Sequence, residues 1–303
     1  TMEAQTEALE KYTVFGRVTP EQKKQFVLLL KKLDHTVAMT GDGVNDILAM
    51  KEADCSIAMA SGNEATIQAA QVALLDSDFS KMPEIVAEGR RVVNNIERSA
   101  SLFLVKNIFS FLLSVFSILF ALTYPLEPSQ ITLISLFTIG VPSFLLALEE
   151  NKNRIEGKFM FNVMEKAIPG GLTDMMVVGA LVVSGVSLQL NKTDVSTAST
   201  MLLTAVGFLV LYKICQPLNR FRGRIILFCA GGIVFSVIFL HKLFSISAIS
   251  AVSILLLIIL FFAAESIFRQ LSQLIEKYSR LKNDQRKRTL IEWLKDLFRF
   301  KFD

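Results

Sequence analysis

Six long apolar segments constrain the fold of this chain more than any other feature of its sequence. Each is close to the ~20 residues that an α-helix needs to cross the hydrocarbon core of a bilayer, and flanking residues can extend the two shortest. A packed soluble core could account for one such segment, but not for six in succession. We therefore predict a bundle of six transmembrane helices, at residues 101–124, 131–148, 168–190, 196–212, 225–240 and 245–264.

The basic residues of this region are concentrated in alternate loops. Lysine and arginine gather after the second span, after the fourth span and in the C-terminal tail, whereas the opposite loops hold only Lys192 and Lys242. By the positive-inside rule the basic segments are cytoplasmic, and an even number of spans puts the N-terminal part on the same side. The predicted organisation is a soluble part at 1–79, a stalk helix at 80–99, a transmembrane domain at 100–267 and a basic cytoplasmic tail at 268–303.

The tail ends in an amphipathic segment that contains Trp293, Leu297 and Phe302. Two interpretations stay open, a helix that lies on anionic headgroups and a solvated helix beside the membrane. No nucleic-acid partner is expected, because the tail directly follows a membrane span. The three cysteines are scattered, which predicts neither a disulfide framework nor a soft-metal site.

The soluble part alternates short apolar runs with helical patterns. Thr19, Pro20 and Gln22 form a capping-box pattern at the start of a helix. Helical patterns separate three predicted buried strands, at 36–39, 55–60 and 72–75. Such alternation indicates a parallel, doubly wound α/β sheet, in which ligands bind at the carboxyl ends of the strands.

The segment TGDGVND, residues 40–46, follows the first of these strands. Its glycines, Gly41 and Gly43, permit tight backbone conformations and the close approach of a phosphoryl group. Asp42 is suited to Mg²⁺, which prefers carboxylates together with phosphate oxygens and water. Lys23, at the start of the preceding helix, could neutralise phosphoryl charge. The joint pattern predicts a magnesium and phosphate site.

Two segments together resemble the phosphorylation domain of P-type ATPases, namely VFGRVTPEQK (14–23) and MTGDGVNDILAMKEADCSIAM (39–59). A third, EGRRVVNNIERS (88–99), is similar to the stalk of these ion pumps. The resemblance implies a haloacid-dehalogenase-like (Rossmann-type) α/β segment followed by an all-α transmembrane bundle. It also implies the cofactors Mg²⁺ and ATP, with ATP bound mainly by a nucleotide-binding domain outside this chain.

The resemblance assigns roles to individual residues. Asp42 would ligate the catalytic Mg²⁺, Asn45 and Asp46 would support the phosphoryl group and the metal shell, and Lys23 would contact the phosphoryl oxygens. The implied phosphate loop consists of Thr40, Gly41 and Gly43. The nucleophile of the family is the aspartate of Asp-Lys-Thr-Gly-Thr, and no aspartate of this sequence is followed by Lys-Thr. Together with the first residue, a threonine, this predicts the C-terminal part of a pump, which cannot form an aspartyl-phosphate without its missing N-terminal part.

The number of spans narrows the kind of pump that the resemblance implies. Heavy-metal pumps typically carry two spans after this domain, whereas six fit pumps for calcium, magnesium, protons or sodium and potassium, and also lipid flippases. We expect the transport residues in the first two spans, at Lys106, Asn107, Ser110, Ser135, Thr138 and Pro142.

Alignment with animal calcium pumps puts Asn107 and Thr138 on ligand positions, but Ser110 and Ile139 where those pumps have carboxylates. Any carboxylate is therefore expected from a span outside this chain. Pro142 could break its helix and free backbone carbonyls as ligands. Lys106 would oppose a divalent ion, so it is interpreted as a built-in counter-ion, a partner of an absent carboxylate or a side chain that snorkels away.

The expected function is transport of an inorganic cation across a bacterial plasma membrane, with calcium as the first guess and magnesium as the second. The alternatives are a lipid or polyamine cargo and a non-catalytic product of a split gene. A membrane-tethered phosphatase is a weaker alternative, because its Asp-x-Asp pattern would have to precede the loop, and the only one, at 76–78, follows it. Asp174 and Glu265 lie near the ends of their predicted spans, which favours an interfacial position over a role in transport.

Overall fold

The computed structural model describes residues 2–155 and 157–283. The chain forms two compact units, of which the first ends at Val86 and the second begins at Ala87. This boundary falls within the segment predicted as a stalk, at 80–99. The end of the predicted tail, with its amphipathic segment, lies outside the described residues, so its two interpretations stay predictions.

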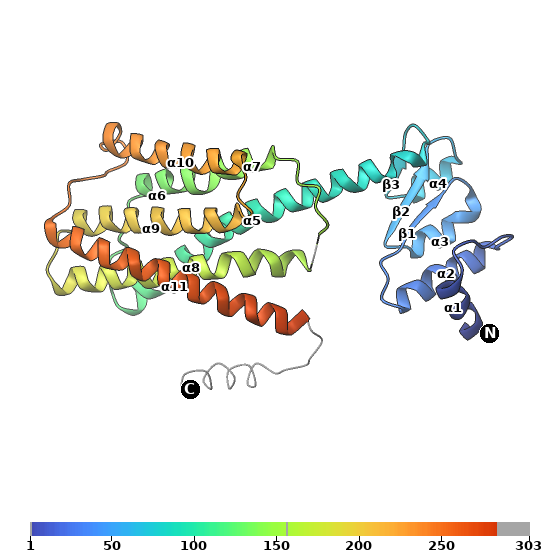
Figure 1. The fold of residues 1–303 in the computed structure, drawn as a ribbon, viewed down its shortest axis with the longest axis horizontal. Coiled ribbons are helices and arrows are strands. Elements are labelled where there is room, and N and C mark those ends of the chain that lie inside the picture. The colour runs from blue at the N-terminus through green and yellow to red at the C-terminus, as the bar shows by residue number, and fades with distance from the viewer. Residues whose placement is uncertain (1, 156, 284–303) are drawn as a thin grey trace. The chain divides into compact units, whose positions relative to one another are not determined.

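The first unit contains a three-stranded parallel sheet with short helices (Figure 1). Its strands are β1 (Ala38–Gly41), β2 (Cys55–Met59) and β3 (Val72–Leu74), in the spatial order β1-β2-β3. Its helices are α1 (Met2–Lys11), α2 (Pro20–Lys32), η1 (Val44–Asp46), α3 (Ile47–Glu52), α4 (Glu64–Ala69) and η2 (Phe79–Lys81). The predicted parallel α/β sheet is confirmed, whereas the order of the described strands does not reverse, as that of a doubly wound sheet would.

Local sequence signals explain where the elements of this unit begin. The hydroxyl of Thr19 accepts a hydrogen bond from the backbone N–H of Gln22 at 3.3 Å, and the side-chain carbonyl of Gln22 accepts one from the N–H of Thr19 at 2.9 Å. This confirms the predicted capping box, which satisfies two backbone donors at the start of α2. The first strand begins later than predicted, at Ala38, and ends at Gly41, so it includes Thr40 and Gly41 of the predicted phosphate loop.

The second unit is helical in its described part. Its elements are α5 (Met82–Leu119), α6 (Pro128–Ser135), the π-helical turn η3 (Leu136–Gly140), α7 (Val141–Ala147), α8 (Phe159–Ser187), α9 (Lys192–Ile214), α10 (Arg220–Phe239) and α11 (Ala251–Asn283). Among the described residues, six helical segments are long and apolar enough to cross a membrane, with α6, η3 and α7 forming one of them. The prediction of six spans is therefore confirmed.

Several helices are longer than the spans predicted for them. The stalk and the first span form one helix, α5, and α11 continues past 264 to Asn283. The helix α8 begins at Phe159 rather than 168, so Pro169 lies inside it and not at its start. Hydropathy marks only the apolar part of a helix, whereas backbone hydrogen bonding continues into the polar turns at its ends.

The core of the second unit lies around α8 and α9. In the most apolar windows of these helices 61% and 50% of the residues are buried, compared with 22% in α5 and α10 and 17% in α11. Helices α8, α9 and α11 pack against one another (Figure 1). The central position of α8 means that polar residues on it are held inside the bundle.

Candidate functional site

The predicted phosphate loop lies at the carboxyl end of β1. Asp42 follows β1 directly and its side chain is exposed, whereas Asp46, at the end of η1, is only 7% exposed. The ammonium of Lys23 in α2 lies 2.6 Å from Oδ1 of Asp46. The structure thus brings together the exposed carboxylate of Asp42, the lysine-paired carboxylate of Asp46 and the exposed Asn45 on one short loop.

Close packing makes glycine necessary at two positions around this loop. A Cβ on Gly41 would lie 2.5 Å from Cβ and 2.9 Å from Oδ2 of Asp46. A Cβ on Gly62 would overlap the backbone carbonyl of Asp42, which also accepts a hydrogen bond from the N–H of Asn63 at 2.8 Å. Gly43, in contrast, is extended (φ −117°) and has open space where a Cβ would stand. Gly43 therefore does not use the tight conformation that a glycine permits, and the open space beside it leaves room for a ligand.

The donor atoms of the loop fit a magnesium ion that keeps some of its waters. Among residues 2–155 and 157–283, no three His, Cys, Asp or Glu side chains come together as a metal site. Mg²⁺ does not need such a cage, since it is usually held by one or two carboxylates, substrate phosphates and water. Asp42 can offer its carboxylate, while Asp46 has one oxygen engaged by Lys23 and one left. Thr40, the first residue of the predicted phosphate loop, lies in β1 and is half-buried.

The second unit contains a cavity of about 50 Å³ among its helices. That volume has room for roughly three to five water molecules. Its walls come from α5, α6, η3, α8, α9 and the segment before α6. The polar residues in its lining are Lys106, Ser110, Ser135, Thr138 and Asp174.

The cavity gathers most of the predicted transport residues, but not all of them. Asn107 is exposed and Pro142 is buried, and neither lines the cavity. The hydroxyl of Thr138 donates to the carbonyl of Ile134 at 2.7 Å, so its lone pairs remain free to accept. A Cβ on Gly207 of α9 would lie 2.8 Å from Cγ2 of Thr138, which shows how closely α9 approaches here. The assignment of these residues to transport stays a prediction.

Asp174 was predicted to lie near the end of its membrane span, and the longer helix α8 changes the basis of that prediction. Because α8 begins at Phe159, Asp174 lies in the middle of it and is 4% exposed. The cavity therefore contains a carboxylate from this chain. From the sequence, a carboxylate was expected only from a span outside this chain. A charged residue five positions after Pro169 was the available signal, but a span that begins at 168 placed it near the membrane surface.

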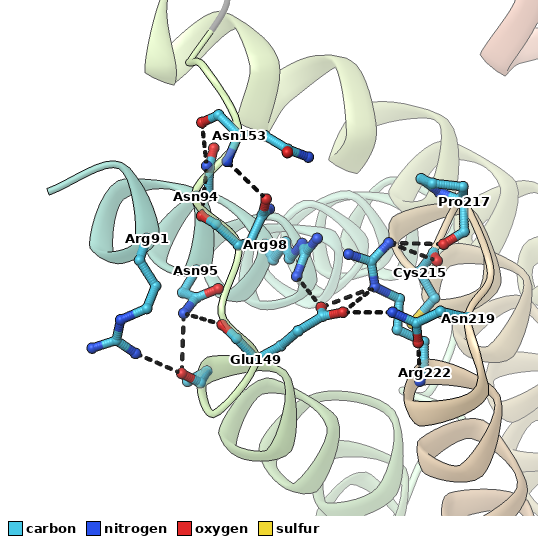
Figure 2. Close-up of polar contacts among 12 residues, drawn as sticks. Arg91, Asn94, Asn95, Arg98, Glu149, Asn153, Cys215, Pro217, Asn219 and Arg222 are labelled. Carbon is cyan, nitrogen blue, oxygen red and sulfur yellow. Dashed lines mark hydrogen bonds and ion pairs between the residues drawn. The ribbon is translucent and has the colours of Figure 1, made fainter. Parts of the chain in front are cut away.

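A partly buried polar cluster at one end of the second unit was not predicted (Figure 2). The carboxylate of Glu149, just after α7, accepts hydrogen bonds from Arg98 of α5 at 2.7 Å and from Arg222 of α10 at 2.9 Å. The side-chain amide of Asn219 donates to it at 2.8 Å. We call Arg98, Glu149, Asn219 and Arg222 the Glu149 cluster.

The Glu149 cluster joins three segments that are far apart in the sequence. Burial by itself would raise the pKa of Glu149, but the hydrogen bonds from Arg222, Asn219 and Arg98 outweigh it and hold that pKa below its ordinary value. Asn95 adds hydrogen bonds to the backbone carbonyls of Ala147 and Glu149, at 3.0 and 3.3 Å (Figure 2). The segment after α7 is thus hydrogen-bonded to α5 both through the side chain of Glu149 and through backbone carbonyls.

Comparison with known proteins identifies the relatives of the chain. It is 43% identical over 251 residues to a probable cation-transporting ATPase, exp7, of Streptococcus pneumoniae, an alignment that covers 80% of the chain and 32% of the relative. It is 38% identical over 254 residues to the calcium-transporting ATPase CtpE of Mycolicibacterium smegmatis, covering 78% and 32%. The calcium-transporting ATPase 1 of Lactococcus lactis is 30% identical over 219 residues, covering 72% and 25%.

The chain is a homologue of cation-transporting P-type ATPases. It spans about a third of the length of the curated relatives it matches first, 32% of each. No protein-family model matches it. As a P-type ATPase homologue with six candidate spans, it is a multi-pass membrane protein.

Proposed function

We propose that the chain is the C-terminal part of an ATP-driven P-type pump for an inorganic cation, with calcium as the first candidate and magnesium as the second. The observation that carries this proposal is the combination, in one homologue of cation-transporting ATPases, of the Asp42 loop with a polar cavity among membrane-spanning helices. The names of two of the relatives reported above include calcium, which supports the order of the candidates.

The first unit would be part of a haloacid-dehalogenase-like phosphorylation domain. Asp42 would hold Mg²⁺, which when bound supplies charge neutralisation at phosphoryl oxygens. Lys23 would orient Asp46 and add positive charge beside the phosphoryl group, and Asn45 would donate hydrogen bonds to it. The open space at Gly43 and the close packing at Gly41 would let the backbone of the loop approach the phosphoryl oxygens.

The nucleophilic aspartate and the site that binds ATP would come from another part of the complete pump. This chain contains no Asp-Lys-Thr sequence, so by itself it should not form an aspartyl-phosphate. We propose a plasma-membrane location, with the first unit and the C-terminal tail on the cytoplasmic side, because the basic residues gather in alternate loops. The cavity in the second unit would be where the cargo is held.

The decisive experiment measures ATP hydrolysis by the complete purified protein in lipid, with Mg²⁺ present throughout. The panel contains Ca²⁺, additional Mg²⁺, Mn²⁺, Na⁺, K⁺, polyamines and phospholipids of different headgroups. Stimulation by an inorganic cation, with Ca²⁺ the most effective, is the expected result. Stimulation by a polyamine or a phospholipid alone would replace the proposal by the lipid or polyamine alternative.

A second experiment separates a pump from a non-catalytic membrane protein. The complete protein is incubated with radiolabelled ATP, quenched in acid and examined for a phosphorylated band, and the isolated chain is treated in parallel. We expect labelling of the complete protein alone and its loss when Mg²⁺ is chelated. Labelling of the isolated chain would contradict the view that its nucleophile lies elsewhere.

A further inference from the structure

A buried carboxylate, that of Asp174, lies in the membrane cavity of the second unit. Asp174 is 4% exposed, and its Oδ1 has no hydrogen-bond partner within the described part of the chain. An ionised carboxylate in such a place is costly unless a cation or a proton compensates its charge. Ionisable groups inside membrane helices are therefore expected to serve a function and to have a partner.

The other charged group in the cavity lining is Lys106 of α5. Both residues line the same cavity. Among the ion pairs of the described residues none joins Lys106 to Asp174, so the ammonium nitrogen and the carboxylate oxygens are more than 4.0 Å apart. The hydroxyls of Ser110, Ser135 and Thr138 add neutral oxygen atoms. The lining thus contains one acid, one base and three hydroxyls, set among apolar side chains.

Two glycines on α8 hold Asp174 in this position. A Cβ on Gly170 would lie 2.6 Å from Cγ2 of Val210 in α9, and a Cβ on Gly171 would lie 2.6 Å from Cγ2 of Ile108 in α5. The backbone of α8 therefore comes unusually close to both neighbouring helices one turn before Asp174. Since residues three and four apart lie on the same face of a helix, Asp174 is directed toward the space between these helices.

We propose that Asp174 is the carboxylate that binds the transported cation in this cavity, and that Lys106 is the resident cation that balances its charge when no ion is bound. This inference rests on the proposed function and adds to it a ligand from the third span of the chain. Carboxylate and hydroxyl oxygens suit a hard cation such as Ca²⁺ or Mg²⁺. The positive charge of Lys106 opposes the entry of such an ion, so the two residues should affect its affinity in opposite directions.

The test uses the complete protein and the cation that stimulates its ATP hydrolysis most. The concentration of that cation at half-maximal stimulation is measured for the wild type and for Asp174→Asn and Lys106→Met. Glu265→Gln is the control, because Glu265 is also an acid within a membrane helix but does not line the cavity. Size-exclusion chromatography checks that each variant is folded.

We expect Asp174→Asn to raise the half-maximal concentration about tenfold or more, since an ionic ligand is lost. Lys106→Met should lower it, and Glu265→Gln should leave it unchanged. If the wild type responds to a cation but Asp174→Asn stays within about twofold of it, the inference is wrong and the proposed function stands. If Asp174→Asn does not fold, Lys106→Met decides, and an unchanged or raised half-maximal concentration overturns the inference. A wild type that no cation stimulates would remove both proposals.

Discussion

Replacing Glu149 with glutamine should destabilise the second unit far more than an ordinary surface substitution. The change keeps the size of the side chain and one acceptor oxygen, but removes the negative charge that Arg98 and Arg222 share. Those two arginines are 9% and 8% exposed and Glu149 is 13% exposed, so water can do little to replace the lost charge.

The expected size of the effect follows from this burial. Removing one partner of a buried ion pair typically costs about 3–5 kcal/mol, because an uncompensated charge is left behind. Here one carboxylate serves two guanidinium groups, at 2.7 and 2.9 Å, while the remaining amide oxygen can still accept one hydrogen bond. We therefore expect a loss of about 3 kcal/mol in the free energy of unfolding for Glu149→Gln.

A denaturant titration in one detergent, followed by helical circular dichroism, measures this loss by linear extrapolation. Glu265→Gln is the matched control, because its ion pair with Arg269 is long, 3.9 Å, and its two side chains are 47% and 65% exposed. An exposed pair of this kind contributes about 0–1 kcal/mol. If both variants lost the same amount, or if Glu149→Gln lost less than about 1 kcal/mol, the reasoning from burial would be refuted.

Three further predictions concern the same protein. The pKa of Glu149 is lowered in the folded state, so the ionised side chain should contribute its full stability above the ordinary glutamate pKa of about 4.3. This contribution should be lost as the pH falls through the lower folded-state pKa. Unfolding titrations across the acid range should therefore show that the free energy of unfolding depends less on pH in Glu149→Gln than in the wild type. A Cβ at Gly171 would lie 2.6 Å from a methyl group of α5, so Gly171→Ala should cost about 1–3 kcal/mol in the same titration, whereas Gly231→Ala, with open space around it, should be neutral or stabilising. Lys23→Met should lower the ATP turnover of the complete protein by about 10²-fold. Lys24→Met is the control and should leave turnover unchanged, because Lys24 pairs only with Glu52, which lies outside the loop. Equal turnover in the two variants would contradict the role given to Lys23.

The sequence predicted those features that depend on local or solvent-facing signals. The length of an apolar segment alone indicates whether it can cross the bilayer, so the six spans could be counted without knowledge of how the helices pack. The capping box at Thr19 and Gln22 is also local, since its hydrogen bonds join residues three apart. Alternation of strands and helices was enough to predict a parallel sheet, but not the order of its strands.

The features that the sequence missed depend on contacts between distant segments. Glu149 contacts Arg98 and Arg222 only in the folded bundle, and the residues next to it in the sequence do not indicate these partners. Asp174 was placed near the end of a span because that span was predicted to begin at 168, whereas α8 begins at Phe159. Asn107 was chosen by alignment with animal calcium pumps, but it is exposed and does not line the cavity, whereas its neighbour Lys106 does, because adjacent positions on a helix point about 100° apart.

The π-helical turn η3 gives the second span two different helical phases. The N–H of Val141 donates to the carbonyl of Leu136, five residues back, so the turn holds one residue more than an α-helical turn. One extra residue rotates everything beyond it by about 100° around the helix axis. The same span therefore presents unlike faces on its two halves, and its neighbours change accordingly: α6 packs against α9, whereas α7 packs against α10. The two halves of this one membrane crossing thereby contact different neighbouring helices. A uniform α-helix of the same sequence would not turn its second half toward the same neighbours.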